Sequence, residues 1–483
     1  MKRYHFRKSD PSVGSDSSKY FLFPALFLPA GGLFLVHIGL RFSYNVSLIT
    51  LLFPVLILLL LIGCVAAVLL QSGYRGSYLP LAAMILLMGI GTLVQIRMHA
   101  APMNIETSKP SAEIVRVETG TGENDAENSG TAFRIHGMRT QLISYVSALV
   151  ALTVIVLYVS GRKFDWIGEK YVLVFILCIA GLTLMVVIAR VLGSGKFLYS
   201  RTPWEPLKIV LPLSLAGFFA YNGRFFRIYD RNKFNFSIAV WGPFFIMCFL
   251  PLLLFMALGD LGQVMIYSIV MLALLYIASG SVIYPVIGLT LIIMLSQMAS
   301  FTAHYLPDYV AGRIELWQHF WAGFPSPEWW DRSYQTANAL FAIQAGGVSG
   351  SGLGLGHPDL VPLSVSDFVF VEIAEELGFI GSFAIILLYL CIILFGIHTA
   401  FQCSRQFDHI AISALSLLFG IQVFINIGGV INIIPLTGIV LPFISKGGFS
   451  VVTFGSLVGL IMAASHRNKV ESLSSSEKGS VYV

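Results

Sequence analysis

Residues 361–381 read VPLSVSDFVFVEIAEELGFIG and combine two properties that rarely occur together. The stretch has the apolar density of a membrane helix, yet it carries Asp367 near its start and Glu372, Glu375 and Glu376 further along. A carboxylate in hydrocarbon costs several kcal/mol unless it is paired, hydrated or protonated. The stretch therefore predicts a membrane span whose acidic residues serve either a site at its mouth or the interior of a helix bundle.

The composition of the whole chain supports this interpretation. Of its 483 residues, 56% are hydrophobic and 11% are charged, and the mean hydropathy is +0.81. Soluble globular domains carry about 25% charged residues. We therefore predict an all-α polytopic integral membrane protein, and we expect no nucleic acid among its partners.

Apolar segments of about twenty residues fit the hydrocarbon core of a bilayer. A large loop, 304–367, is expected between the ninth and tenth of these segments. We predict about twelve transmembrane helices, at 21–40, 48–70, 78–97, 140–160, 170–192, 206–221, 237–258, 261–279, 281–303, 368–396, 408–430 and 448–466.

Lysine and arginine in short loops predict the orientation. They cluster in the N-terminal segment 1–20, in the loops 161–170 and 222–236, and after the last span. With twelve spans these segments fall on one side, so both termini are expected in the cytoplasm. The polar segment 98–138 and the tryptophan-rich segment 304–367 are then extracytoplasmic, the first a loosely ordered loop and the second a structured cap at the membrane interface. The polar tail 467–483 is expected to be disordered.

Charged and polar residues gather near the outer ends of the predicted spans. Glu205 and Lys208 are three residues apart and can pair on one helix face. The other residues of this kind are Asp260, Arg313, Arg332, Gln335 and Asp367. Together they fit a site for an anionic, membrane-bound substrate.

Residues 432–450, NIIPLTGIVLPFISKGGFS, contain two prolines, several glycines and Lys446 in an otherwise apolar stretch. This composition breaks a helix. Non-helical backbone at membrane depth is tolerated only where protein or a water-filled cavity surrounds it. We therefore expect this segment to face the same site.

Simpler explanations remain for several of these features. Glu205 and Lys208 could form an ordinary interfacial ion pair, and Asp367 could be a helix N-cap. Glu375 and Glu376 could only hold the bundle together. The glycine-rich run 346–356, GGVSGSGLGLG, lacks the ending of a Walker loop and the spacing of a dinucleotide fingerprint, so we interpret it as a flexible turn.

Five motifs, in order along the chain, resemble those of the SEDS proteins (shape, elongation, division and sporulation). They are WEPLK (204–208), GDLGQ (259–263), YQTANALFAIQAGGVSGSGLGLG (334–356), SDFVFVEIAEELGFIG (366–381) and PLTGIVLPFISKGGFS (435–450). The resemblance extends roughly over residues 80–466. Members of this family are bacterial peptidoglycan polymerases that usually have ten spans. The resemblance thus implies a SEDS-like core at 71–466 and extra N-terminal helices at 21–70.

The chain departs from the family pattern at several positions. The family's Pro-Glu-x-His before the aspartate is here Pro362-Leu363-Ser364-Val365. Lys446 stands where tyrosine is usual, and Phe449 stands where serine is usual. Glu372 is an additional acid at a position that is usually aliphatic.

The resemblance implies that the substrate is lipid II and that Asp367 is the catalytic carboxylate. The implied substrate contacts are Glu205, Lys208, Arg313, Gln335, Ser445 and Lys446. The implied structural residues are Asp260, Glu375, Glu376, Pro442, Gly447 and Gly448. No protein metal site is expected, and the only cofactor considered is a divalent cation, magnesium or manganese.

The family resemblance also implies a place and partners. The place is the bacterial cytoplasmic membrane, which the chain crosses several times. The partners are a class B penicillin-binding protein with transpeptidase activity and other proteins of an elongation or division complex. Two other functions remain open: a transporter of lipid II, and a non-catalytic scaffold of such a complex. A transporter usually shows inverted repeats, whereas this sequence shows one broken region and no repeat.

Overall fold

The computed structural model describes residues 48–100, 126–161, 165–191, 202–223, 238–290 and 308–480 apart from 323 and 325. All regular secondary structure in these residues is helical. The helices are α3 (Leu48–Gln71), α4 (Leu79–Ala100), α5 (Ala126–Gly161), α6 (Asp165–Glu169), α7 (Tyr171–Val191), α9 (Leu207–Asn222), α10 (Ile238–Leu258), α11 (Leu261–Ser279), α13 (Asp308–Gln318), α14 (Pro327–Gly346), the 3-10 turn η3 (Pro358–Leu360), α15 (Val369–Gln402), α16 (Gln406–Val430) and α17 (Gly448–Ser480).

Eight of the described helices are long and apolar enough to cross a membrane: α4, α5, α7, α10, α11, α15, α16 and α17. Large apolar side chains on these helices are exposed, as expected for a surface in contact with lipid, for example Leu177, Leu253 and Phe379. The chain is thus an all-helical polytopic membrane protein, as predicted. Of the predicted spans, 21–40 and most of 281–303 lie outside the described residues, and α9, at 16 residues, is shorter than a span.

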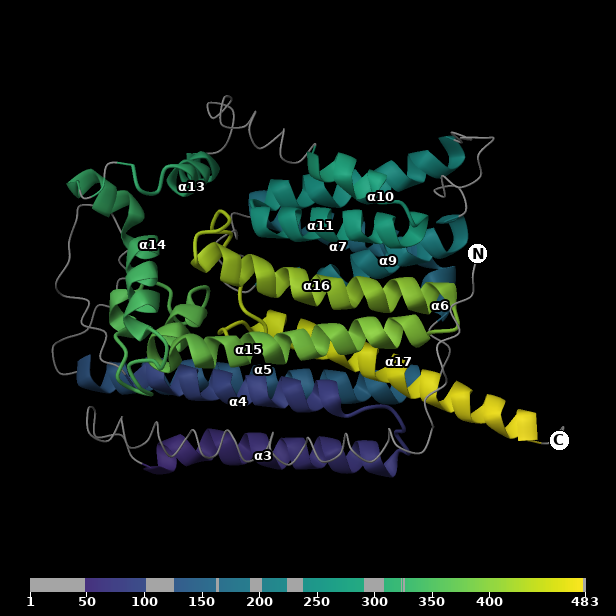
Figure 1. Cartoon of the computed structure of the whole chain (residues 1–483), viewed down its shortest axis with the longest axis horizontal. Helices are drawn as coiled ribbons and strands as arrows, with labels where there is room; N and C mark the ends of the chain where they lie inside the picture. Colours follow the sequence, from purple (N-terminus) through teal and green to yellow (C-terminus); the bar gives the residue numbers. More distant parts are fainter. Residues whose placement is uncertain are drawn as a thin grey trace.

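The long helices lie side by side, and α13 and α14 lie at one end of the bundle (Figure 1). The C-terminal part of α17 projects from the opposite end. Among the candidate spans α4, α16 and α17 are the most buried. α17 packs along α5, and α15 packs along both α16 and α4.

Helix α15 is broken at Gly378, whose φ of 65° and ψ of −164° are not helical. The glycine-rich run 346–356 covers this break with backbone hydrogen bonds. These bonds join Ser351 N to Glu375 O (2.9 Å), Gly352 N to Glu376 O (3.0 Å), Phe379 N to Gly347 O (2.9 Å) and Ile380 N to Val348 O (3.2 Å). The run that we interpreted as a flexible turn is therefore bonded along a membrane helix, where it satisfies groups that the break exposes.

Among the described residues, helix boundaries differ most from the expected ones in two places. α5 begins at Ala126, so a helix occupies 126–138 within the segment 98–138 that was expected to be a loop. α17 continues to Ser480, into the segment 467–483 for which disorder was expected. The segment 304–367 contains α13, α14 and η3.

The close approach of the glycine-rich run to α15 depends on Gly350. Its φ is +81°, and a Cβ at this position would overlap the carbonyl oxygen of Glu376. We expect Gly350→Ala to lower the free energy of unfolding by about 2 kcal/mol or more, because backbone strain and displacement of the run add together. The measurement is the melting temperature of the purified protein in detergent.

Gly181→Ala on α7 is the matched control, since a Cβ at Gly181 meets no atom within 4 Å. This variant should melt at or slightly above the wild-type temperature, because alanine favours a helix by about 1 kcal/mol over glycine. If Gly350→Ala and Gly181→Ala had the same melting temperature, the glycine-rich run would not stabilise the broken helix.

Candidate active site

The segment 431–447 between α16 and α17 forms no regular helix, although it joins two candidate spans. Side chains from four helices donate hydrogen bonds to its carbonyl oxygens. They are Asn426 Nδ2 to Ile439 O (2.6 Å), Gln422 Nε2 to Val440 O (2.8 Å), Tyr389 OH to Pro442 O (2.6 Å), Tyr145 OH to Phe443 O (2.7 Å), Gln95 Nε2 to Ile444 O (3.3 Å) and Gln141 Nε2 to Ser445 O (3.2 Å). The oxygen of Leu441 accepts from Ser445 N at 3.1 Å. Every carbonyl from 439 to 445 is therefore satisfied.

A second irregular segment, 361–368, carries Asp367 to the start of α15 and is bonded to the first. Val365 O accepts from Lys446 N at 3.2 Å and from Gln95 Nε2 at 3.0 Å. Asn426 Nδ2, which bonds Ile439 O, also donates to Asp367 O at 2.9 Å. The backbone on both sides of the Asp367 carboxylate is thereby fixed.

The Asp367 side chain is half-buried and faces Gly438, where a Cβ would lie 3.5 Å from Asp367 Oδ2. Burial raises the pKa of the Asp367 carboxyl above its ordinary value, while the Ser366 hydroxyl and the charge of Arg313 act in the opposite direction. A carboxylate with a raised pKa at the edge of a span has the character of a proton acceptor.

Helices α13 and α14 contact the same two segments. Arg313 on α13 donates to Leu436 O at 3.4 Å, and Trp317 donates to Ile433 O at 3.2 Å. On α14, Gln335 Nε2 donates to Pro362 O at 3.1 Å. The Arg313 side chain is exposed and Gln335 is half-buried. Both side chains are accessible from outside the bundle, and the charge of Arg313 acts on Asp367.

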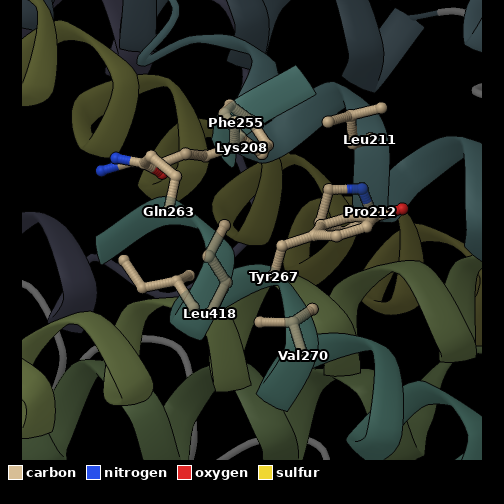
Figure 2. Close-up of a pocket in the computed structure, with 9 residues that line it drawn as sticks. Lys208, Leu211, Pro212, Phe255, Gln263, Tyr267, Val270 and Leu418 are labelled. Atoms are coloured by element: carbon tan, nitrogen blue, oxygen red, sulfur yellow. The ribbon is translucent and has the colours of Figure 1, made fainter. Parts of the chain in front are cut away.

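Glu205 and Lys208 form an ion pair of 2.7 Å, and both side chains are buried. Lys208 Nζ also donates to Gln422 Oε1 at 3.2 Å. Asp260 caps α11 by accepting from Gln263 N at 3.1 Å. Lys208 and Gln263 line a cavity of about 10 Å³ (Figure 2), which has room for a single water and not for a sugar. Because Gln422 also donates to Val440 O, the ion pair is linked to the segment 431–447 through Gln422.

The three deeper glutamates of α15 are buried beside Arg97 of α4. Arg97 Nε bonds Glu376 Oε1 at 3.0 Å, and Arg97 Nη2 donates to Gly356 O at 2.7 Å. The same Glu376 oxygen accepts from Gly356 N at 3.2 Å. Glu375 Oε1 accepts from His357 N at 3.1 Å. Glu375 and Glu376 thus hold the end of the glycine-rich run against α15.

The remaining predicted residues lie within or next to the segment 431–447. Ser445 is buried, and its Oγ accepts from Leu441 N at 2.8 Å, so it closes a turn of this segment. Lys446 is half-buried, and burial lowers the pKa of its ammonium group. Pro442 is buried, whereas Gly447 and Gly448, at the start of α17, are more accessible.

Sequence reasoning missed the residues that hold these segments. They are Gln95, Arg97, Gln141, Tyr145, Tyr389, Gln422 and Asn426. The amides and Arg97 had a usable signal, because each is a polar residue inside an apolar span and such residues usually face the bundle interior. Tyr145 and Tyr389 had no such signal, because tyrosine is also common on lipid-facing surfaces near the interface.

The chain is similar in sequence to known proteins. A family model described as a cell cycle protein, FtsW/RodA/SpoVE, matches residues 124–470. The peptidoglycan glycosyltransferase RodA of Mycobacterium tuberculosis (strain ATCC 25618 / H37Rv) is 34% identical over 207 residues, 43% of this chain and 42% of that protein. The peptidoglycan glycosyltransferase MrdB of Escherichia coli (strain K12) is 25% identical over 346 residues, 70% of this chain and 88% of that protein.

A solved structure shows the same fold. It is described as "Structural coordination of polymerization and crosslinking by a peptidoglycan synthase complex", and one of its chains matches with a TM-score of 0.53 and 17% identity, over 80% of this chain and 97% of that chain. Because the family model covers well over half of the sequence, the chain belongs to the FtsW/RodA/SpoVE family. The match spans less than half of the length of the mycobacterial relative.

Tyr389 provides a test of the carbonyl contacts. Its hydroxyl is buried and donates to Pro442 O, so Tyr389→Phe leaves that carbonyl without this donor while keeping the ring. We expect a loss of about 1–3 kcal/mol in the free energy of unfolding, the cost of an unsatisfied buried polar group. Thermal unfolding in detergent measures the loss.

Tyr276→Phe on α11 is the matched control, because the Tyr276 side chain is 46% exposed. Its effect should stay within about 0.5 kcal/mol. Equal melting temperatures for the two variants would show that the Tyr389 contact contributes nothing to the fold.

Proposed function

We propose that this protein polymerises lipid II into glycan strands at the outer face of the bacterial cytoplasmic membrane, in cell elongation, division or sporulation. Family membership supports the proposal, as do the relatives that are named peptidoglycan glycosyltransferases. The observation that carries it is the position of Asp367, a half-buried carboxylate at the mouth of a span with an exposed arginine nearby.

In this reaction a sugar 4-hydroxyl of one substrate attacks the anomeric carbon of the other. The new glycosidic bond forms as the bond from that carbon to undecaprenyl pyrophosphate breaks, and the pyrophosphate leaves with the electron pair. The hydroxyl is a weak nucleophile, so a carboxylate within hydrogen-bond reach accelerates the step by accepting its proton. We assign this role to Asp367. Direct attack of this kind inverts the configuration at the anomeric carbon and needs no covalent intermediate.

The leaving pyrophosphate needs positive charge close by. Arg313 is exposed and Lys446 is half-buried, so both are accessible to a substrate. Lys208 is buried in its pair with Glu205, and we assign it the role of fixing Gln422 beneath the site. Gln335 and Ser445 then contribute mainly through the backbone of the segments they bond.

Within the described residues, no group of three His, Cys, Asp or Glu side chains is placed to hold a metal ion. Magnesium commonly takes one or two carboxylates and completes its shell with substrate phosphates and water. Asp367 and the pyrophosphate together fit that pattern, so a divalent cation would arrive with the substrate. Its effect would be to neutralise charge on the pyrophosphate.

A transporter of lipid II is the second candidate. Broken helices at membrane depth, seen here at Gly378 and at 431–447, occur in transporters. Both breaks, however, are closed by hydrogen bonds to fixed parts of the bundle, which favours a rigid enzyme site. A scaffold without activity remains the third candidate, and a polymerisation assay with purified protein and labelled lipid II separates the three.

The proposed reaction at the outer face requires a defined orientation of the chain in the membrane. We propose twelve spans, both termini in the cytoplasm, and the cap 304–367 outside. Cysteine labelling near Trp330 from the outer face tests this, and labelling only from the inner face would overturn it.

We also propose a transpeptidase partner of the class B penicillin-binding type, and the similarity to a chain of a peptidoglycan synthase complex supports it. Purification of the protein without any such partner under mild detergent would argue against a stable complex.

Replacement of Asp367 is the most direct test of the mechanism. Asp367→Asn keeps the shape of the side chain and removes the base, so glycan synthesis should fall by at least about 100-fold. The melting temperature should stay near wild type. Asp331→Asn, an exposed aspartate of α14, is the control and should polymerise normally. A wild-type rate for Asp367→Asn would remove Asp367 from the mechanism.

The raised pKa of Asp367 predicts the pH dependence of the reaction. Asp367 must be ionised to act as a base, so the rate should fall as the pH drops through a pKa above that of an ordinary aspartate. Arg313 lowers this pKa, so Arg313→Gln should move the acidic limb to higher pH. Arg332→Gln, an exposed arginine paired with Glu315 in the same cap, should leave the limb unmoved. If the acidic limb of the pH–rate profile did not shift in Arg313→Gln, the charge of Arg313 would not act on the pKa of Asp367.

A further inference from the structure

A cavity of about 250 Å³ lies far from Asp367, where the connection from α3 to α4 meets α5 and α17. This connection lies at the end of the bundle opposite α13 and α14 (Figure 1). The lining residues are Ser72, Tyr74, Val156, Leu157, Ser160 and His466. Ser72 and Tyr74 precede the part of the chain that the family model matches, and the other four lie within it. The cavity therefore lies where the connection that follows α3 meets the part of the chain that the family model matches.

The connection is fixed on α17 by three hydrogen bonds. Tyr74 OH donates to Met462 O at 3.1 Å, Arg75 N donates to His466 Nδ1 at 2.9 Å, and Ser77 N donates to Ser465 Oγ at 3.3 Å. Gly76 allows this close approach, because a Cβ there would lie 2.9 Å from His466 N. The rings of Tyr74 and His466 are stacked with centroids 5.5 Å apart. These contacts fix the lining residues Tyr74 and His466 in place.

The polar part of the lining contains no carboxylate, and the hydroxyls of Ser72 and Tyr74 already donate to Leu69 O and Met462 O. Ser160 Oγ is buried and has no hydrogen-bond partner among the described residues. His466 Nδ1 accepts from Arg75 N, so the neutral ring carries its proton on Nε2 and can donate from there. The Arg75 side chain does not line the cavity, but it is exposed next to Tyr74, and its positive charge acts on the lining residue His466. This set favours an anionic ligand.

The other part of the lining is apolar: Val156 is buried, and Leu157 faces the bilayer. Val156 and Leu157 belong to the span Thr140–Ser160, and Leu157 is 40% exposed. Ser160 is the last residue of that span, so the polar part lies at the level of the lipid headgroups. The ligand must therefore combine an anionic head with an apolar body. Basic pockets between membrane helices at this depth suit lipid headgroups.

We propose that this cavity binds the phosphate of an anionic phospholipid, with Ser160, His466 and Arg75 donating to the headgroup and Leu157 contacting an acyl chain. Bound lipid would hold the N-terminal helices on the family core. This site is separate from Asp367, so the proposal stands or falls independently of glycan synthesis.

The test compares lipid binding in nanodiscs of phosphatidylcholine with and without phosphatidylglycerol. After extraction into detergent, native mass spectrometry should find phosphatidylglycerol retained in preference to phosphatidylcholine. Ser160→Leu fills the cavity and should abolish this preference. Arg75→Gln should weaken retention about tenfold, the effect of losing one charge-assisted hydrogen bond.

Two further variants keep the result interpretable. Ser160→Ala removes only the hydroxyl, so it should reduce retention while the melting temperature stays unchanged. Lys170→Gln removes an exposed positive charge elsewhere, between α6 and α7, and should bind as wild type. Equal retention of the two lipids by the wild type would overturn the proposal. So would retention that is unchanged in Ser160→Leu, Ser160→Ala and Arg75→Gln.

Discussion

Seven successive carbonyls, from residue 439 to residue 445, lie outside any helix between two membrane helices, and each one accepts a hydrogen bond. A backbone group left unsatisfied in hydrocarbon costs several kcal/mol, so this segment is tolerated only with a complete set of donors. Six of the donors are side chains, contributed by α4, α5, α15 and α16. The positions of these helices relative to one another are therefore constrained by the needs of one short segment.

The position of Asp367 follows from the same constraint. Gln95 bonds both Ile444 O and Val365 O, and Asn426 bonds both Ile439 O and Asp367 O. Two irregular segments that are distant in the sequence thus share their donors. A change in one segment is transmitted to the other through these amides. The Asp367 carboxylate gains a fixed place at the edge of the bundle although it lies in no helix.

The parts of this arrangement that sequence could predict are those with a local signal. The spacing of Glu205 and Lys208 predicted their pairing, and the prolines and glycines of 432–450 predicted an irregular segment. The contact of Arg97 with Glu376 could not be predicted, because the two residues are far apart in the chain and any of three glutamates could have met the arginine. The role of the run 346–356 was hidden for a similar reason: glycines are typical of exposed turns as well as of close backbone contacts. The break at Gly378, which the run 346–356 covers, shows that these glycines make close backbone contacts.

Two of the three buried carboxylates of α15, those of Glu375 and Glu376, can be explained by what they bond. Glu376 and Glu375 accept from the backbone of Gly356 and His357, where the glycine-rich run ends and the chain turns toward Asp367. Arg97 compensates the charge of Glu376 and bonds Gly356 O, while Gln95, two residues earlier on α4, bonds Val365 O. One helix therefore holds both ends of the segment that leads to Asp367. Glu375 and Glu376 bind α15 to the same segment, which explains how a membrane span can contain these two carboxylates without exposing them to lipid.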